Sequence, residues 1–294
     1  VIDTAINYRC QRSERTIGQA LEHLIAEGVV TRDELILCTK GGYVPFDGAV
    51  PKDPARYILE TVVNTGLASY DDIVGGCHCL APAYLAHALE TSLRNLRVQT
   101  IDVYYLHNPE QQLDEVSRET FLRRLEAAFA VLEARVREGQ IRYYGTATWN
   151  GYRCNAQARE YLSLETLVDL AVRVGGANHH FRVIQLPYNL AMPEAFAFRN
   201  QTVNGDTVSV LEAAQRLGLS VVASASLQQG RLAQLGSGLA RYIPKVDTDS
   251  QRAVQFVRST PGVTTALIGM KQSRHVEENL ALARQPLLTV EQIQ

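Results

Sequence analysis

The sequence predicts a parallel α/β fold, closed into a (β/α)8 TIM barrel. Short apolar runs alternate with amphipathic helical segments along nearly the whole chain of 294 residues. Most of these runs are continuously apolar, which is typical of parallel strands covered on both faces. No G-x-G-x-x-G follows an early run, so the main sequence sign of an open dinucleotide-binding sheet is missing. We therefore favour the closed barrel over an open doubly wound sheet, and we expect residues 1–294 to form one domain.

Seven segments have the composition of strands. They are Val1–Asp3, Leu35–Thr39, Ile101–Leu106, Ile141–Thr146, Val183–Leu186, Ser220–Ser224 and Thr265–Ile268. A barrel of this type has eight strands, and with seven it would keep an open seam with unpaired strand edges. The chain opens directly on a strand, so the simplest explanation is that the first strand lies upstream of Val1 or is absent from this chain.

Five segments between the strands carry apolar residues at helical spacing. They are Ser13–Glu27, Tyr84–Leu96, Phe121–Arg137, Val208–Leu217 and His275–Ala283. The segment 41–81 is much longer than a usual βα loop and contains a helical piece near Pro54–Thr65. Because it follows a strand, we expect this insertion to begin on the catalytic face, where it forms part of the substrate pocket or a lid. The alternative is a surface decoration packed beside the barrel.

Composition excludes several functional classes. A net charge of −2 and a pI near 6.4 give no sign of a surface for nucleic acid or anionic membranes. No apolar run is long enough to span a bilayer, and there is no signal peptide. The five cysteines are few and odd in number, so we expect a reducing, cytoplasmic location rather than a disulfide framework.

Four polar side chains fall at or just after the ends of predicted strands: Asp3, Tyr8, Lys40 and His107. Active sites of such barrels lie at the carboxyl ends of the strands. A phenol is a weak acid, and a nearby ammonium favours its phenolate. A carboxylate can hold that ammonium, and a histidine can hydrogen-bond the oxygen that accepts a proton. Together these groups suit protonation of a carbonyl oxygen while a hydride arrives at its carbon.

Six segments, in order along the chain, resemble the signature segments of the aldo-keto reductase superfamily. They are Asp3-Thr4-Ala5-Ile6-Asn7-Tyr8 with Ser13-Glu14 and Ile17-Gly18, Leu35-Ile36-Leu37-Cys38-Thr39-Lys40, Ile101-Asp102-Val103-Tyr104-Tyr105-Leu106-His107, Ile141-Arg142-Tyr143-Tyr144-Gly145-Thr146, Gln185-Leu186-Pro187-Tyr188-Asn189, and Ile268-Gly269 with Glu277-Glu278-Asn279. Each match alone is weak, but six in sequence are specific.

The resemblance implies that Asp3, Tyr8, Lys40 and His107 are a catalytic tetrad. Tyr8 would be the general acid for reduction and its phenolate the base for oxidation. Lys40 would favour the phenolate, Asp3 would pair with Lys40, and His107 would orient and polarise the carbonyl. The implied enzyme is an oxidoreductase that takes a small carbonyl substrate and needs no metal.

The resemblance also implies a nicotinamide cofactor, usually NADPH, with NADH possible. Thr146, Thr148, Asn150 and Gln185 are candidates for holding the carboxamide. The phosphates would lie near the loops after the last strands and at a helix N-terminus. The remaining candidates are Ser224, Leu227, Gly230, Leu232, Gly269, Lys271, Ser273, Arg274, Glu278 and Asn279.

Three positions depart from the family pattern. Ser224 stands where an aromatic residue usually stacks on the nicotinamide, and Arg274-His275 alters the usual arginine before Glu-Asn, which leaves NADP or NAD preference open. Arg9 replaces the more usual glycine after Tyr8, where a cation would narrow the substrate entrance or bind an acidic group. The runner-up function is therefore a weakly catalytic or non-catalytic subunit that senses the cofactor or binds a partner; a metal-free barrel lyase or isomerase is a third.

Two histidine-containing pairs need separate interpretation. Cys77-His78-Cys79 suggests metal ligands, but no second cluster is near in sequence, so we expect His78 at the catalytic face rather than on a metal. His179-His180 precedes a strand, and we expect it to be a solvated turn.

Overall fold

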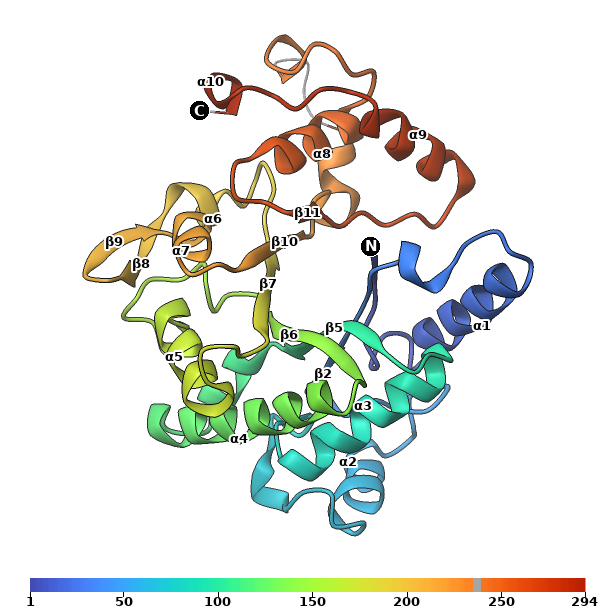
Figure 1. Ribbon diagram of the computed structural model, residues 1–294, viewed down its shortest axis with the longest axis vertical. Coiled ribbons are helices and arrows are strands. Elements are labelled where there is room, and N and C mark those ends of the chain that lie inside the picture. Colours follow the sequence, from blue (N-terminus) through green and yellow to red (C-terminus); the bar gives the residue numbers. More distant parts are fainter. Residues whose placement is uncertain (235–238, 294) are drawn as a thin grey trace. The chain divides into compact units, whose positions relative to one another are not determined.

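The computed structural model describes residues 1–234 and 239–293, and by its internal contacts the chain divides into two compact units (Figure 1). Unit 1 comprises Val1–Gly151, Ala158–Leu162 and Thr166–Val183, and unit 2 comprises Tyr152–Gln157, Ser163–Glu165 and Ile184–Gln294. The strand β7 (Phe181–Pro187) passes from one to the other.

The sheet of unit 1 has the strand order β1-β2-β5-β6-β7. Its strands are β1 (Ile2–Asp3), β2 (Leu37–Gly41), β5 (Ile101–His107), β6 (Ile141–Ala147) and the first part of β7. The pairs β1–β2, β2–β5 and β5–β6 are parallel. Lys40 lies beside Tyr105 on β5, and His107 lies beside Ala147 on β6. This register carries the ends of the strands to the same edge of the sheet.

The helices of unit 1 include α1 (Arg12–Ala26), α3 (Pro82–Leu96), α4 (Arg118–Arg137) and α5 (Leu164–Gly175, whose first residues belong to unit 2). α1 packs on α3 and α3 on α4, which the ribbon shows as a row (Figure 1). Gly18 permits the first contact, because a Cβ there would lie 2.3 Å from the carbonyl oxygen of Asn95. The Ser117 hydroxyl caps α4 by accepting the Thr120 N–H.

Unit 2 contains the end of β7, then β10 (Ser220–Ser224) and β11 (Thr265–Ala266), in that order. β10 and β11 are parallel. The hairpin β8 (Arg199–Val203) and β9 (Asp206–Ser209) is a separate antiparallel pair. The helical segments that the structure describes here are α6 (Glu194–Ala197), α7 (Val210–Arg216), η5 (Gln228–Ala233), η6 (Leu239–Arg241), α8 (Asp249–Ser259), α9 (Ser273–Ala283) and α10 (Val290–Ile293).

The insertion 41–81 carries its own elements. They are α2 (Pro54–Ile58), a π-helical turn η2 (Leu59–Val63), a 3-10 turn η3 (Tyr70–Asp72) and the hairpin β3 (Ile73–Val74) with β4 (His78–Cys79). Two further 3-10 turns in unit 1 are η1 (Arg32–Glu34) and η4 (Pro109–Asp114). The two ends of the insertion pair with each other, since Cys79 donates its N–H to Gly42 O at 2.7 Å and Val44 donates to Cys77 O at 2.7 Å.

The seven predicted strands all occur within the described residues, in the predicted order. All five predicted helices are confirmed to within three residues at each end. The prediction Val208–Leu217 begins two residues early because Val208 and Ser209 belong to β9; Ser209 then caps α7. The helical piece near Pro54–Thr65 is confirmed as α2 and η2.

Candidate functional site

Lys40 lies at the carboxyl end of β2 with its side chain 1% exposed. Its Nζ donates to Asp3 Oδ1 at 2.5 Å and to the carbonyl oxygen of Thr4 at 2.8 Å. Two acceptors on the β1 segment therefore hold a buried ammonium, which satisfies the requirement that a buried charge be paired. Since an ammonium carries three N–H bonds, one of them is left for other partners.

Tyr8 lies on the turn after β1 and is 39% exposed. The Lys40 Nζ is 5.0 Å from the centroid of its ring. The His107 ring lies edge-on to it, with centroids 5.8 Å apart and an interplanar angle of 77°. The structure therefore brings Asp3, Tyr8, Lys40 and His107 together within unit 1.

The turn after Tyr8 has an unusual backbone. Arg9, Cys10 and Gln11 have φ values of 51°, 55° and 68°, in the left-handed region that costs roughly 1–2 kcal/mol per residue for side chains with a Cβ. The insertion holds this turn, because Gly48 donates its N–H to Cys10 O at 3.0 Å. Glycine adopts such φ values freely. This gives a physical reason why the family pattern described above has glycine at the position of Arg9.

His107 is the last residue of β5, and its Nδ1 is buried with no partner among the described residues. Burial disfavours the imidazolium, and the charges of Lys40 and His78 add to this effect. Together they lower the pKa of His107 to about 3. The imidazole is therefore neutral near pH 7 and carries a single N–H.

The insertion borders His107 through Tyr43, a residue that the sequence reasoning did not single out as catalytic or binding. Its ring lies edge-on to both His107 and His78, with centroids 5.0 Å apart in each case. Asn108 donates to the Tyr43 hydroxyl at 3.0 Å, and the Tyr84 hydroxyl donates to Tyr43 O at 2.7 Å. An aromatic residue three positions after the strand-ending Lys40 was the only sequence signal.

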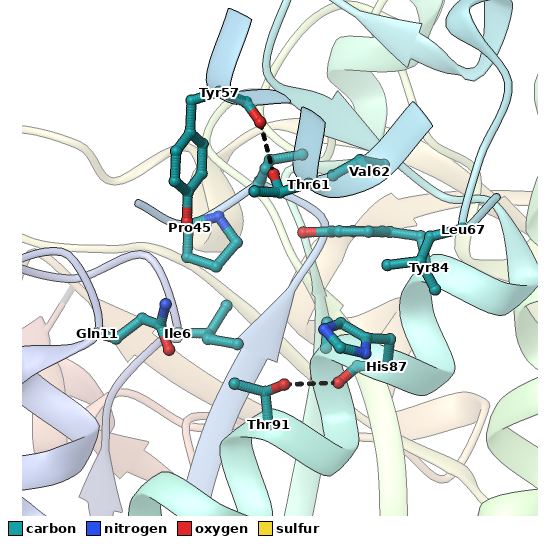
Figure 2. A pocket seen from close by; sticks show the side chains of 12 residues that line it. Ile6, Gln11, Pro45, Tyr57, Thr61, Val62, Leu67, Tyr84, His87 and Thr91 are labelled. Atoms are coloured by element: carbon teal, nitrogen blue, oxygen red, sulfur yellow. Dashed lines mark hydrogen bonds between the residues drawn. The ribbon is translucent and has the colours of Figure 1, made fainter. Parts of the chain in front are cut away.

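A small pocket lies near Tyr43, between the insertion and α3 (Figure 2). Figure 2 shows the Tyr84 hydroxyl pointing toward the space among Tyr57, Thr61 and Pro45. The lining residues are Ile6, Gln11, Val44, Pro45, Tyr57, Thr61, Val62, Leu67, Tyr84, His87, Ala88 and Thr91. Tyr84 thus lines the pocket and bonds the backbone of Tyr43.

Glu110, which sequence reasoning also missed, fixes the loop after β6. It is 6% exposed, and its Oε1 accepts the backbone N–H groups of Trp149 at 2.8 Å, Asn150 at 3.2 Å and Gly151 at 3.4 Å. Burial raises the pKa of this carboxyl. On the same loop, the Thr148 hydroxyl is buried and has no partner among the described residues. Thr146 is buried, whereas Asn150 is exposed.

The other predicted cofactor residues belong to unit 2. Gln185 is buried on β7, and Ser224 ends β10, where its carbonyl accepts the Tyr188 N–H at 3.1 Å. Glu278 accepts a hydrogen bond from the Thr248 hydroxyl at the N-cap of α8. The remaining residues lie on or beside η5, β11 and α9: Leu227, Gly230, Leu232, Gly269, Lys271, Ser273, Arg274 and Asn279.

Two sequence interpretations of histidines have different outcomes. His78 lies against His107, with its Nε2 2.8 Å from the carbonyl oxygen of that residue. The solvated turn expected at His179-His180 is wrong: His179 is 5% exposed, and His180 Nδ1 lies 2.9 Å from Glu133 Oε2. The partner, Glu133 on α4, is distant in the sequence, and no local pattern connects it with this histidine pair.

Two searches of the described residues are negative. In residues 1–234 and 239–293, no group of three or more His, Cys, Asp or Glu side chains has the arrangement of a metal site. Within the same residues, every helix is too short or too polar to cross a membrane.

Comparison with known proteins places the chain among reductases. The model of the aldo/keto reductase family matches residues 1–252. The chain is similar to the protein named "Uncharacterized oxidoreductase C215.11c" from Schizosaccharomyces pombe, with 25% identity over 285 residues, which are 96% of this chain and 69% of the yeast protein. The family match and this relative support a general oxidoreductase activity.

The solved structures that resemble the chain include two aldo-keto reductases. One is the thermostable aldo-keto reductase Tm1743 in complex with the inhibitor epalrestat, with a TM-score of 0.62 and 19% identity over 99% of this chain and 79% of that chain. The other is the aldo-keto reductase AKR11C1 from Bacillus halodurans in its holo form, with a TM-score of 0.64 and 20% identity over 99% and 79%. With the family match, they confirm the (β/α)8 barrel fold.

Proposed function

This chain belongs to the aldo/keto reductase family, and we propose that it is an NAD(P)H-dependent oxidoreductase that reversibly reduces an aldehyde or ketone to an alcohol. The observation that carries the proposal is the buried Lys40 ammonium beside the ring of Tyr8, with His107 at the edge of that ring. A binding module has no need of a buried cation against a phenol. The substrate class that suits this acid is a small carbonyl compound.

In the proposed reaction, Tyr8 donates its phenolic proton to the carbonyl oxygen while the carbonyl carbon receives a hydride. The phenolate that remains is stabilised by the Lys40 ammonium, which Asp3 and the Thr4 carbonyl hold in place. In oxidation, the Tyr8 phenolate takes the proton back from the alcohol. The negative charge that develops on Tyr8 during the reaction is thus stabilised by the Lys40 ammonium, which is already oriented.

His107 supports this step as a neutral hydrogen-bond donor. Because its pKa is about 3, the imidazole does not compete with Tyr8 as an acid at neutral pH. Its single N–H polarises the carbonyl and fixes which side of the substrate faces Tyr8. Tyr43 and the half-exposed Trp149 offer aromatic side chains on the flanking loops for the rest of the substrate.

The residues after β6 fit a nicotinamide carboxamide, since the buried Thr148 hydroxyl has an unused hydrogen-bonding capacity among the described residues. A reduced nicotinamide supplies the hydride when bound. Thr146 and Asn150 of unit 1 would share in holding this group, and Gln185 and Ser224 of unit 2 are the sequence-based candidates for the rest of the nicotinamide. Lys271 and Arg274 would neutralise the pyrophosphate or a ribose 2′-phosphate at the start of α9, and Glu278 and Asn279 would hold the adenine.

The test is a fluorescence titration with NADPH and NADH, followed by a panel of aldehydes and ketones monitored by nicotinamide absorbance. We expect binding of at least one reduced cofactor and carbonyl-dependent oxidation of that cofactor. Binding without turnover across the panel would contradict the proposed enzyme. It would favour the second candidate, a cofactor-sensing or partner-binding subunit, for which the small Ser224 side chain at the ring position is the supporting observation.

A further inference from the structure

A chain of buried and partly buried hydrogen bonds leads from α4 to the backbone of His107. Arg124 donates from Nη1 to Gln112 Oε1 at 2.5 Å. The Gln112 Nε2 then lies 2.8 Å from His78 Nδ1 and 3.2 Å from His78 O. Finally, His78 Nε2 lies 2.8 Å from the carbonyl oxygen of His107.

The direction of these bonds follows from the donor-only guanidinium. Because Arg124 can only donate, the Gln112 atom that it contacts is the amide oxygen, and the amide nitrogen faces His78. The two Gln112 N–H bonds are then donated to Nδ1 and to the carbonyl of His78. His78 Nδ1 is therefore an acceptor, its proton sits on Nε2, and this N–H is donated to the carbonyl oxygen of His107.

The site is built for a neutral imidazole at residue 78. His78 and Gln112 are both 0% exposed, and burial lowers the pKa of His78 to about 4. A Cβ at Gly42 would lie 2.9 Å from His78 Nε2 and 3.0 Å from the His107 carbonyl oxygen. Only a glycine at position 42, where φ is 137°, leaves the backbone just after β2 close enough to this bond without a clash.

His107 needs such support because its own ring lacks the usual one. Histidines at functional sites are generally oriented by a hydrogen bond on the nitrogen that does not contact the substrate. In the described residues, Nδ1 of His107 has no such partner. The peptide group of His107 is instead held by His78, and the ring is held by edge-on contact with Tyr43.

We propose that His78 is a positioning residue for His107: its Nε2–H, oriented by Gln112 and Arg124, fixes the His107 peptide and so the direction of the neighbouring imidazole. This inference rests on the proposed function for its catalytic consequence. The insertion 41–81 thereby has a role in the site, because its strand β4 brings His78 within hydrogen-bond distance of the His107 backbone.

The first test compares three variants by kcat, KM and cofactor affinity. His78→Leu loses the donor, and His78→Gln keeps an N–H in a similar place. His23→Gln, on the exposed surface of α1, is the matched control. We expect His78→Leu to lose kcat by roughly 10- to 100-fold, as a small misplacement of a catalytic group does, with NADPH affinity unchanged. His78→Gln should recover most of the loss. Equal kcat in His78→Leu and wild type would overturn the proposal.

A second variant changes the tautomer without changing His78. In Gln112→Glu the carboxylate faces Nδ1 and draws the proton there, so Nε2 presents a lone pair to the His107 carbonyl. We expect kcat to fall as pH rises, because only the doubly protonated imidazole keeps both bonds. Groups that face His78 or His107 are Tyr8, Lys40, Tyr43, Arg124 and the flanking cysteines. Of these groups, Arg124 is the one that contacts residue 112, and it keeps an acceptor there because a carboxylate also accepts from the guanidinium. The wild-type pH profile serves as the control.

Nitrogen-15 NMR of the histidines separates this proposal from the proposed function. We expect the His78 signals of the wild-type protein to report an Nε2–H tautomer, and the His107 ring signals to shift in His78→Leu. These signals decide the proposal even if the wild type turns over no carbonyl, which would instead overturn the proposed function. An Nδ1–H tautomer at His78, or His107 signals unchanged in a folded His78→Leu, would contradict the positioning role.

Discussion

Lys40 and Tyr8 are adjacent in space but differ in how the chain holds them. Lys40 lies on a regular strand, 1% exposed, with two hydrogen-bond acceptors. Tyr8, 39% exposed, directly precedes a left-handed turn, and the insertion donates a hydrogen bond to that turn. The position of the Lys40 charge therefore depends on the barrel framework, whereas the position of the Tyr8 phenol depends on loop conformation. Substitutions at the two places should therefore have different costs for stability.

The largest combined effect is expected for Lys40→Met. Removing the ammonium leaves the Asp3 carboxylate beside a buried apolar side chain, which should cost about 3–5 kcal/mol of stability. Turnover should fall by at least about 1000-fold, since a preoriented charge is lost. Urea unfolding and steady-state kinetics measure both losses, with the exposed Lys52→Met as control. Partial recovery of stability in Lys40→Met with Asp3→Asn would confirm the pair, and full stability in Lys40→Met would refute it.

The buried histidines should make stability fall in acid. The pKa values of His107 and His78 are about 3 and about 4, below the unfolded value of about 6.5. As pH falls below 6.5, the unfolded chain takes up protons that the folded chain does not, so stability is lost. Each group contributes a slope of about 1.4 kcal/mol per pH unit between pH 6 and 4. The free energy of unfolding, measured at three pH values between 6 and 4, should therefore fall more steeply with decreasing pH in the wild type than in His78→Gln. Parallel dependences would contradict the neutral, buried state of His78.

A smaller effect is expected at the loop after β6. Glu110→Ala removes the acceptor of three backbone N–H groups, which should cost about 1–3 kcal/mol and weaken cofactor binding by roughly 10-fold. Glu110→Gln keeps one acceptor oxygen and should lose less. Cofactor titration of the two variants checks that Glu110→Ala loses more affinity than Glu110→Gln. Unchanged binding in Glu110→Ala would show that this loop does not contribute to cofactor binding.

The smallest effect is expected in the turn itself. Arg9→Gly and Arg9→Ala both delete the side chain, but only glycine relieves the left-handed backbone at φ 51°. The glycine variant should be more stable than the alanine variant by about 1 kcal/mol in urea unfolding. Equal stability would mean that the turn is not strained at this residue.

Much of the framework could be predicted because parallel strands leave a clear pattern. The continuous apolar runs located all seven strands, and strand ends then located Asp3, Lys40 and His107 without any knowledge of the loops. The helices α5 and α8 were not among the predicted segments, because the helical spacing of their apolar residues was not recognised in the sequence. The hairpins β3–β4 and β8–β9 were missed because His78–Cys79, Arg199–Val203 and Asp206–Ser209 are not continuous apolar runs.

The supporting residues of the site could not be predicted from local pattern. Tyr43 and His78 meet only because Cys77 and Cys79 pair with the chain after β2, a contact between residues more than thirty positions apart. Glu110 acts on backbone N–H groups about forty residues away. Such long-range contacts have no periodicity, so a sequence shows the chemically active groups more readily than the groups that orient them.

The central claim is that Tyr8 is the proton donor that the Lys40 ammonium assists. The most direct measurement is single-turnover oxidation of bound NADPH by a carbonyl substrate in wild type and Tyr8→Phe, followed at the nicotinamide absorbance. We expect Tyr8→Phe to bind NADPH with wild-type affinity and to unfold at the same urea concentration, while its single-turnover rate falls by at least about 1000-fold. A rate within a few fold of wild type would contradict it.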